Sequence, residues 1–153
     1  MSDIVLLDSG PLGLVTNPRE SAETRACNDW MEGLLTSGTG VLVPEISDYE
    51  VRRELLRAER HRGLRRLDAL KTVIGFLPIT TPVMLTAAEY WATARKRGRP
   101  ATRDEDIDCD MILAAQATHL AAGGNRVVVA TMNTRHFELF VDARHWRDIK
   151  PDA

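Results

Sequence analysis

The sequence lacks the features that mark secreted, zinc-stabilised or membrane-spanning proteins. It has only two cysteines, Cys27 and Cys109, and no CxxC motif, so it offers no disulfide framework. Its four histidines do not have the spacing of zinc ligands. No apolar run approaches the roughly 20 residues that cross a bilayer, and the chain does not open with a signal-type segment. We therefore expect a cytoplasmic protein that has no membrane association.

Aromatic residues are also scarce, at 5%, whereas the hydrophobic and charged fractions of 44% and 27% are typical of a globular protein. The length predicts a single domain over residues 1–153. The net charge of −2 conceals a separation of charge, because arginines concentrate in residues 52–66 and acids in residues 104–110. A basic region beside an acidic centre indicates an anionic partner and a cation between them. The alternative is that these arginines form a solvated helix face.

Short apolar segments alternate with longer segments of helical pattern. The apolar segments predict strands at residues 4–7, 41–43, 75–80 and 126–131, and a last short strand near 146–149. The intervals predict helices at residues 11–16, 20–36, 44–61 and 81–97. Two more helices are predicted: one continues after a break at Gly63 to residue 73, and one follows a loop over 98–106 and ends at 122. This alternation predicts an α/β fold with a parallel sheet of about four to five strands.

The first predicted strand is followed directly by a carboxylate. Residues 4–7, IVLL, have the pattern of a buried parallel strand, and Asp8 follows directly. Ligands of open α/β sheets bind beyond the carboxyl ends of the strands, so Asp8 is a candidate site residue. The alternative is that Asp8 or Ser9 caps a helix that is entered through Pro11.

Two further acids share this context. Glu50 follows the second strand, and Asp110 lies in DIDCDMILAAQATHLAAGG. Because a helix advances about 100° per residue, Asp110 shares a face with three alanines that we expect to pack inward, Ala114, Ala117 and Ala121. An acid on such a face differs from a solvated surface acid, although the positive end of the helix dipole also stabilises it there.

Carboxylates that converge repel one another unless a cation lies among them. Mg²⁺ and Mn²⁺ prefer hard oxygen ligands, so acids from separate strand ends could form a metal site that acts on a phosphodiester. Many α/β proteins have acids at strand ends, and this spacing alone does not identify the chemistry.

Four motifs, taken in order, carry a resemblance to a known family. They are LLDSG, VPEISDYEVRREL, DCDMILAAQA and VVVATMNTRHF, and they extend over nearly the whole chain. The sequence resembles PIN-domain proteins, and among them the VapC-type toxin ribonucleases of type II toxin–antitoxin systems. The resemblance implies a PIN-like three-layer α/β/α fold with a central parallel sheet.

The resemblance also implies an activity and a set of site residues. The activity is endoribonuclease cleavage that depends on Mg²⁺ or Mn²⁺ and hydrolyses RNA with a metal-activated water. Asp8, Glu50 and Asp110 would be the metal ligands, and Asn133 would take the fourth catalytic position, where many members have Asp. The neutral Asn133 leaves open whether one metal or two are bound. The implied partners are an RNA substrate, a cognate antitoxin and a second copy of the chain in a homodimer.

Three neighbours of the acids are candidates for a supporting role. Ser9 and Thr131 could hydrogen-bond to the acids or to water on a metal, with helix capping and turn formation as the alternatives. Asp108 lies about 200° around the helix from Asp110, so we expect it to cap that helix, with support of the site as the alternative.

Two other polar residues are expected to lie outside the chemistry. Glu54 lies one turn after Glu50, and we expect it to pair with Arg53 or Arg57 on the helix surface. His136 lies close to the fourth motif's asparagine, and we expect it to pack in the turn rather than act as a general acid.

The sequence supports two classes of function. The intact set of Asp8, Glu50 and Asp110 favours a nuclease, whereas Asn133 favours a catalytically weak PIN-like module that binds RNA or a protein. Metal-dependent cleavage of RNA distinguishes the two.

Overall fold

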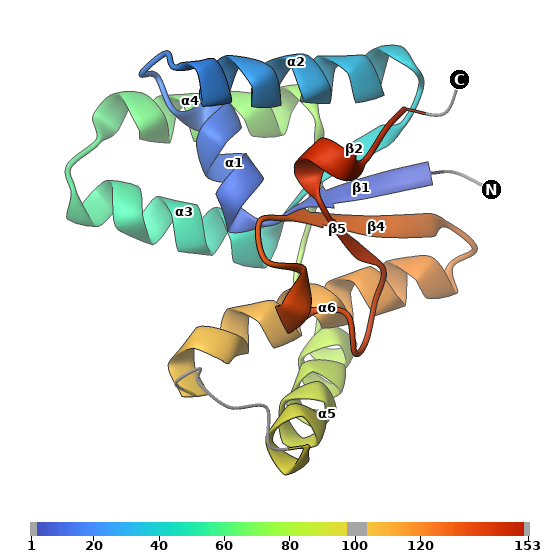
Figure 1. Ribbon diagram of the computed structural model, residues 1–153. Helices are drawn as coiled ribbons and strands as arrows, with labels where there is room; N and C mark the ends of the chain where they lie inside the picture. The colour runs from blue at the N-terminus through green and yellow to red at the C-terminus, as the bar shows by residue number, and fades with distance from the viewer. Residues whose placement is uncertain (1–2, 98–103, 152–153) are drawn as a thin grey trace.

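The fold is built around a sheet of five parallel strands (Figure 1). The computed structural model describes residues 3–97 and 104–151, except for the side chains of 104–106. The strands are β1 (Asp3–Leu7), β2 (Gly40–Pro44), β3 (Gly75–Leu77), β4 (Arg126–Thr131) and β5 (Ala143–His145). Their order in the sheet is β3-β2-β1-β4-β5, and every pairing is parallel. The predicted α/β class and strand number are confirmed.

Strand β1 lies at the centre of the sheet. Val5 is paired with Val41 of β2 on one side and with Val128 of β4 on the other. Leu6 and Leu7 are both fully buried, and they belong to core clusters on opposite faces of the sheet. A strand that is covered on both faces needs a continuous apolar run rather than an alternating one, which explains IVLL.

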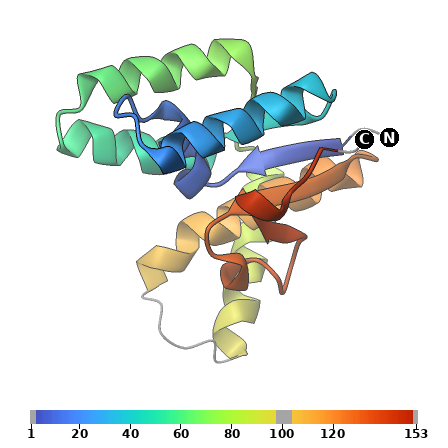
Figure 2. The same ribbon diagram turned by 45° about the horizontal axis from the view of Figure 1, so that its top comes forward.

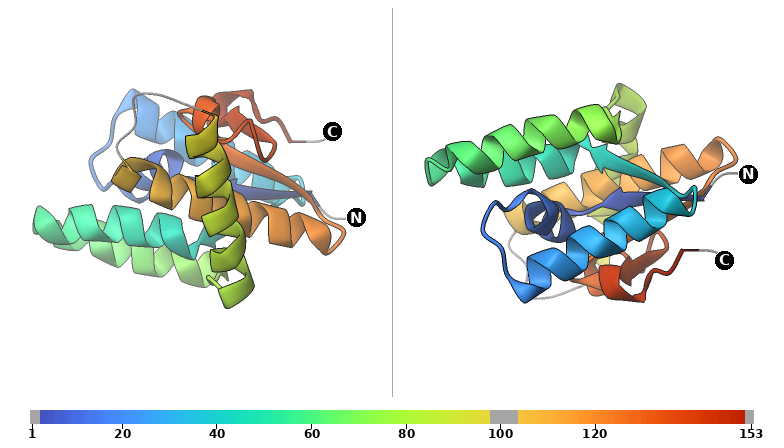
Figure 3. Two further views of the ribbon diagram at one scale, coloured as in Figure 1. Left: turned by 90° about the horizontal axis from the view of Figure 1, so that it is seen from below. Right: turned by 90° about the horizontal axis from the view of Figure 1, so that it is seen from above.

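Helices cover both faces of the sheet and make three layers (Figure 2). On one face, α1 (Ser9–Thr16), α2 (Ala22–Thr36) and α4 (His61–Val73) pack on the cluster that contains Leu7. On the other, α6 (Asp104–Ala122) packs on the cluster that contains Leu6. Helix α5 (Thr81–Lys96) lies across α6 (Figure 3). Helices α3 (Glu45–Arg57) and α4 form a hairpin at the carboxyl ends of the strands.

The break between α3 and α4 differs from the prediction. Helix α3 ends at Arg57, and the chain turns at Glu59, whose φ is +55°. Gly63, where the break was predicted, lies inside α4. A Cβ at Gly63 would be 2.8 Å from Cδ2 of Leu55, so this glycine permits the close approach of the two helices instead of ending one of them.

Helix α6 begins earlier than predicted. It starts at Asp104, so the predicted loop over 98–106 is wrong for its last three residues, while 98–103 lie outside the described residues. Asp108 is therefore in the second turn of the helix and exposed, and the prediction that it caps the helix is wrong.

The last strand also differs from the prediction. Strand β5 is Ala143–His145, and a 3₁₀ turn, η2 (Trp146–Asp148), occupies most of the predicted strand at 146–149. Trp146 and Ile149 are both buried in the cluster that contains Leu7. A 3₁₀ turn brings residues three apart to one side, so it buries both of them, whereas an extended strand would point them to opposite faces.

Across residues 3–97 and 104–151, none of the helices has the length and apolar character that a membrane span requires.

Candidate active site at the carboxyl edge of the sheet

Asp8, Glu50 and Asp110 come from three elements that meet at the carboxyl edge of the sheet. Asp8 directly follows β1, Glu50 lies midway along α3, and Asp110 lies in the second turn of α6. Asp8 and Asp110 are each only 8% exposed, and Glu50 is partly buried. The charges of Asp8 and Asp110 both raise the pKa of Glu50, so the fold brings both of these acids close to Glu50.

Both oxygens of Asp8 accept hydrogen bonds. The Thr131 hydroxyl donates to Oδ2 at 2.7 Å, and the Ser9 backbone N–H donates to Oδ1 at 2.8 Å. Asp8 is also the N-cap of α1, so the capping role and the strand-end placement coincide in one residue. Burial raises the pKa of Asp8, and the bonds from Thr131 and Ser9 oppose that shift.

Thr131 connects Asp8 to the turn that follows β4. Its hydroxyl is fully buried, donates to Asp8, and accepts from the backbone N–H of Asn133 at 3.0 Å. Thr131 thus occupies the supporting position that the sequence suggested. Ser9 contacts Asp8 through its backbone, whereas Asp108 is exposed and lines a hollow between α5 and α6.

Glu50 carries an unpaired, buried oxygen. Within the described residues, its Oε1 has no hydrogen-bond partner and almost no contact with solvent. Burial, followed by the charges of Asp8 and Asp110, raises the pKa of Glu50 from 4.5 to about 7, and Arg53 opposes the shift. A carboxylate in this environment is stabilised by a proton or by a cation.

Asp110 is held by a residue that the sequence had assigned to turn packing. Nδ1 of His136 lies 2.5 Å from Oδ2 of Asp110, and Nε2 of His136 lies 3.0 Å from Nδ2 of Asn133. With the Asn133 amide as donor, Nε2 accepts and Nδ1–H donates to Asp110. His136 reaches Asp110 because the short helix η1 (Thr134–His136) turns it back over the site. The only signal in the sequence was its position three residues after Asn133.

Glu54 does not join the acids. It accepts hydrogen bonds from Nε and Nη2 of Arg57, at 3.0 and 2.7 Å, and it lies on the exposed side of α3. The prediction of a surface pair is confirmed.

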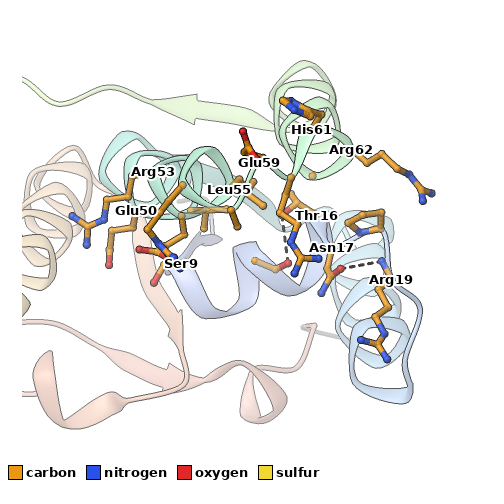
Figure 4. Close-up of a pocket in the computed structure, with 18 of the residues that line it drawn as sticks. Ser9, Thr16, Asn17, Arg19, Glu50, Arg53, Leu55, Glu59, His61 and Arg62 are labelled. Carbon is orange, nitrogen blue, oxygen red and sulfur yellow. Dashed lines mark hydrogen bonds and ion pairs between the residues drawn. The ribbon is translucent and has the colours of Figure 1, made fainter.

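A basic groove leads away from the acids. It has a volume of about 1160 Å³, begins at Ser9 and Glu50, and runs along α1 and α3 to the start of α4 (Figure 4). Five arginines line it, against three glutamates: Arg19, Arg53, Arg57, Arg60 and Arg62. The basic segment at residues 52–66 thus contributes to an open surface. Arg52 does not line the groove and forms ion pairs with Asp48 and Asp68 instead.

The three acids offer the type of ligand atom that a hard divalent cation prefers. Their donors are carboxylate oxygens, and one of them, Oε1 of Glu50, is buried without a partner. In the part of the chain that the structure describes, no three histidine, cysteine or acidic side chains lie close enough together to hold a metal as they stand. His136 occupies one oxygen of Asp110, and hydrogen bonds engage both oxygens of Asp8. These bonds leave lone pairs on the same oxygens, so metal binding would require the acids to move closer together.

No protein-family model matches the sequence, and no curated protein matches it. Solved structures do match its fold. VapBC2 from Rickettsia felis, bound to a DNA fragment from its promoter, matches with a TM-score of 0.71 and 13% identity, over 94% of this chain and 98% of that one. VapBC-1 from nontypeable Haemophilus influenzae has a TM-score of 0.68 and 18% identity, over 95% and 99%.

A third structure, VapC20 of Mycobacterium tuberculosis, described as a sarcin–ricin loop cleaving toxin, has a TM-score of 0.61 and 15% identity, over 90% and 97%. At these identities the likeness shows the fold, which is the fold of VapC structures over nearly the full length of both chains.

Proposed function

We propose that this chain is a PIN-domain endoribonuclease that requires Mg²⁺ or Mn²⁺ and serves as the toxin of a toxin–antitoxin pair. The observation that supports this most directly is Glu50, whose buried Oε1 lacks a partner and whose pKa is raised to about 7 beside Asp8 and Asp110. Three acids in mutual repulsion lower the stability of the protein and are retained where they bind a cation. The match to VapC structures, one of them described as a sarcin–ricin loop cleaving toxin, supports RNA as the substrate.

Asp8, Glu50 and Asp110 would hold the cation, with Asn133 at the rim able to add an amide oxygen. When bound, a divalent cation neutralises the phosphate and promotes attack by water. Thr131 fixes the orientation of Asp8 through the bond to Oδ2. His136 does the same for Asp110, and both residues thereby limit the rotamers that the two acids can adopt.

The partners belong to the same proposal. Two of the similar structures are VapBC complexes, which supports a cognate antitoxin for this chain. The basic groove beside the acids suits an anionic ligand, because its arginines outnumber its glutamates in a chain of net negative charge. We also propose a single domain, a homodimer and a cytoplasmic location.

A second function has its own support. Asn133 adds no charge to the site, and the acids do not form an assembled metal-holding group within the described residues. A PIN-like module that binds RNA or a protein without cleaving would have these properties.

RNA cleavage distinguishes the two functions. Purified protein is incubated with single-stranded and structured RNA in Mg²⁺, in Mn²⁺ and in EDTA. We expect cleavage only with metal, and we expect Asp8→Asn, Glu50→Gln and Asp110→Asn each to abolish it. Asp29→Asn, on the exposed side of α2, is the matched control and should cleave like the unmodified protein. Retention of full activity by any of the three site variants would remove that residue from the proposed site.

A further inference from the structure

An exposed aromatic side chain lies one residue before Glu50 on α3. Tyr49 precedes Glu50 on α3, and its side chain is 54% exposed in a chain that has few aromatic residues. The guanidinium carbon of Arg53, one helical turn later, lies 5.1 Å from the centre of the Tyr49 ring. Arg53 therefore covers one face of the ring, and the exposed fraction leaves much of the rest open to a ligand.

Arg53 also faces the acids. Its charge acts on Glu50 of the same helix and on Cys109 of α6, so its guanidinium lies where α3 approaches the segment that carries Asp110. In Figure 4 the side chains of Arg53 and Glu50 leave α3 in the same direction, at the end of the groove where Ser9 lies.

The neighbouring arginines of α3 are used differently. Arg52 donates to Asp48 and Asp68, and Arg57 donates to Glu54. Among the ion pairs of the described residues, Arg53 has none with a carboxylate, and its guanidinium lies over the Tyr49 ring. Arg53 is thus a cation at the mouth of the site, and none of the acids that the structure describes forms an ion pair with it.

We propose that Tyr49 and Arg53 position the RNA at the site, with Arg53 binding the phosphate next to the cleaved bond and Tyr49 stacking on the adjoining base. The proposal rests on the nuclease function proposed above. A guanidinium binds phosphate through two parallel hydrogen bonds, and unpaired RNA bases stack readily on aromatic rings. Because Tyr49 and Arg53 are four residues apart on α3, the stacking ring and the phosphate-binding guanidinium lie one helical turn apart.

A positive charge at the position of Arg53 offsets the repulsion between the acids and an RNA phosphate. A phosphodiester that approaches Asp8, Glu50 and Asp110 is repelled by them unless a fixed positive charge lies close to its path. Arg53 supplies that charge without neutralising the acids by direct pairing. It is a positioning residue whose effect should be seen in RNA binding even without metal.

The test measures RNA binding in EDTA, so that cleavage does not contribute. A labelled single-stranded RNA that contains 2-aminopurine is titrated with protein. Anisotropy reports affinity, and quenching of 2-aminopurine reports stacking. The variants are Tyr49→Phe, Tyr49→Ala, Arg53→Lys and Arg53→Gln. The control is Arg126→Gln, which removes the same charge at the opposite, amino-terminal end of β4.

We expect Tyr49→Ala to weaken binding roughly 5- to 150-fold and to abolish the quenching, since stacking on one aromatic side chain contributes about 1–3 kcal/mol. Tyr49→Phe should retain both, because the ring is kept. Arg53→Gln should weaken binding roughly tenfold and reduce the salt dependence by about one phosphate contact. Arg53→Lys should keep the salt dependence but lose part of the affinity, because it lacks the planar fork.

The outcomes separate this proposal from the function on which it rests. If the unmodified protein does not cleave RNA with metal, the proposed function fails. If it cleaves, but Tyr49→Ala and Arg53→Gln bind RNA like Arg126→Gln, the positioning role is wrong. Unmodified protein that does not bind RNA in EDTA also overturns it. Variants that bind RNA normally but escape inhibition by a protein partner would assign this surface to that partner instead. Melting curves identify any variant that is unfolded, and the two conservative variants then carry the test.

Discussion

Replacing Glu50 with glutamine should stabilise the metal-free protein at alkaline pH. The folded environment raises the pKa of Glu50 from 4.5 to about 7, chiefly through burial and then through the charges of Asp8 and Asp110. The folded state therefore binds this proton more tightly than the unfolded state does. Stability from this group is fully present below pH 4.5 and is lost as the pH rises to about 7.

The size of the effect follows from the two pKa values. Each pH unit between them corresponds to about 1.4 kcal/mol, so ionised Glu50 costs the folded state about 3 kcal/mol above pH 7. Glutamine keeps the shape of the side chain but cannot ionise, so Glu50→Gln should recover that amount. For a chain of this length, about 3 kcal/mol corresponds to roughly 6–12 °C in melting temperature.

Thermal melts in EDTA from pH 4 to pH 9 test this directly. The curves of the unmodified protein and Glu50→Gln should coincide near pH 4, separate progressively as the pH rises above 4.5, and reach their full difference above about pH 7. Glu54→Gln makes the same change one turn later on α3, in an exposed pair with Arg57, and is the control. Addition of Mg²⁺ at pH 8 should stabilise the unmodified protein more than Glu50→Gln. Melting curves of the two proteins that run parallel across the whole pH range would refute the reasoning.

Three further predictions concern the supports and the rim of the site. Thr131→Val removes the hydroxyl that donates to Asp8 and should lower stability by about 1–3 kcal/mol in urea unfolding; unchanged stability would show that the buried bond contributes nothing. Asn133→Asp should tighten Mn²⁺ binding in calorimetric titration and lower the metal-free melting temperature, because it adds a negative charge close to His136 and the acids; if neither changes, Asn133 lies outside the metal site. Arg57→Glu should weaken RNA binding most at low salt, and an unchanged salt dependence would assign it to the solvated helix face.

The sequence predicted the sheet well because buried parallel strands leave a simple signal. IVLL lies in the central strand β1 and RVVVAT forms β4 beside it, and the acids that follow the strands meet at one edge. Boundaries were less predictable where the cause was a contact between distant residues. Gly63 resembled a helix breaker, but its absent side chain makes room for Leu55 of the neighbouring helix.

The roles of individual polar residues were harder to predict than their presence. Arg52 and Arg53 are adjacent and chemically identical, but helix rotation directs one into an ion-pair network with Asp48 and the other toward Glu50. His136 contacts Asp110 only because a single 3₁₀ turn follows Asn133. Such contacts depend on the packing of separate elements, and no local pattern in the sequence encodes them.

Asp8 shows why two interpretations of one residue need not compete. As a cap it accepts the Ser9 N–H at one oxygen, and as a residue at a strand end it accepts the Thr131 hydroxyl at the other. An ionised carboxylate has about four acceptor positions, so these two bonds leave capacity for a cation. The bonds also hold Asp8 in one orientation, which lowers the entropy that a metal would have to overcome on binding. The interactions that place Asp8 at the start of α1 therefore also prepare it as a ligand.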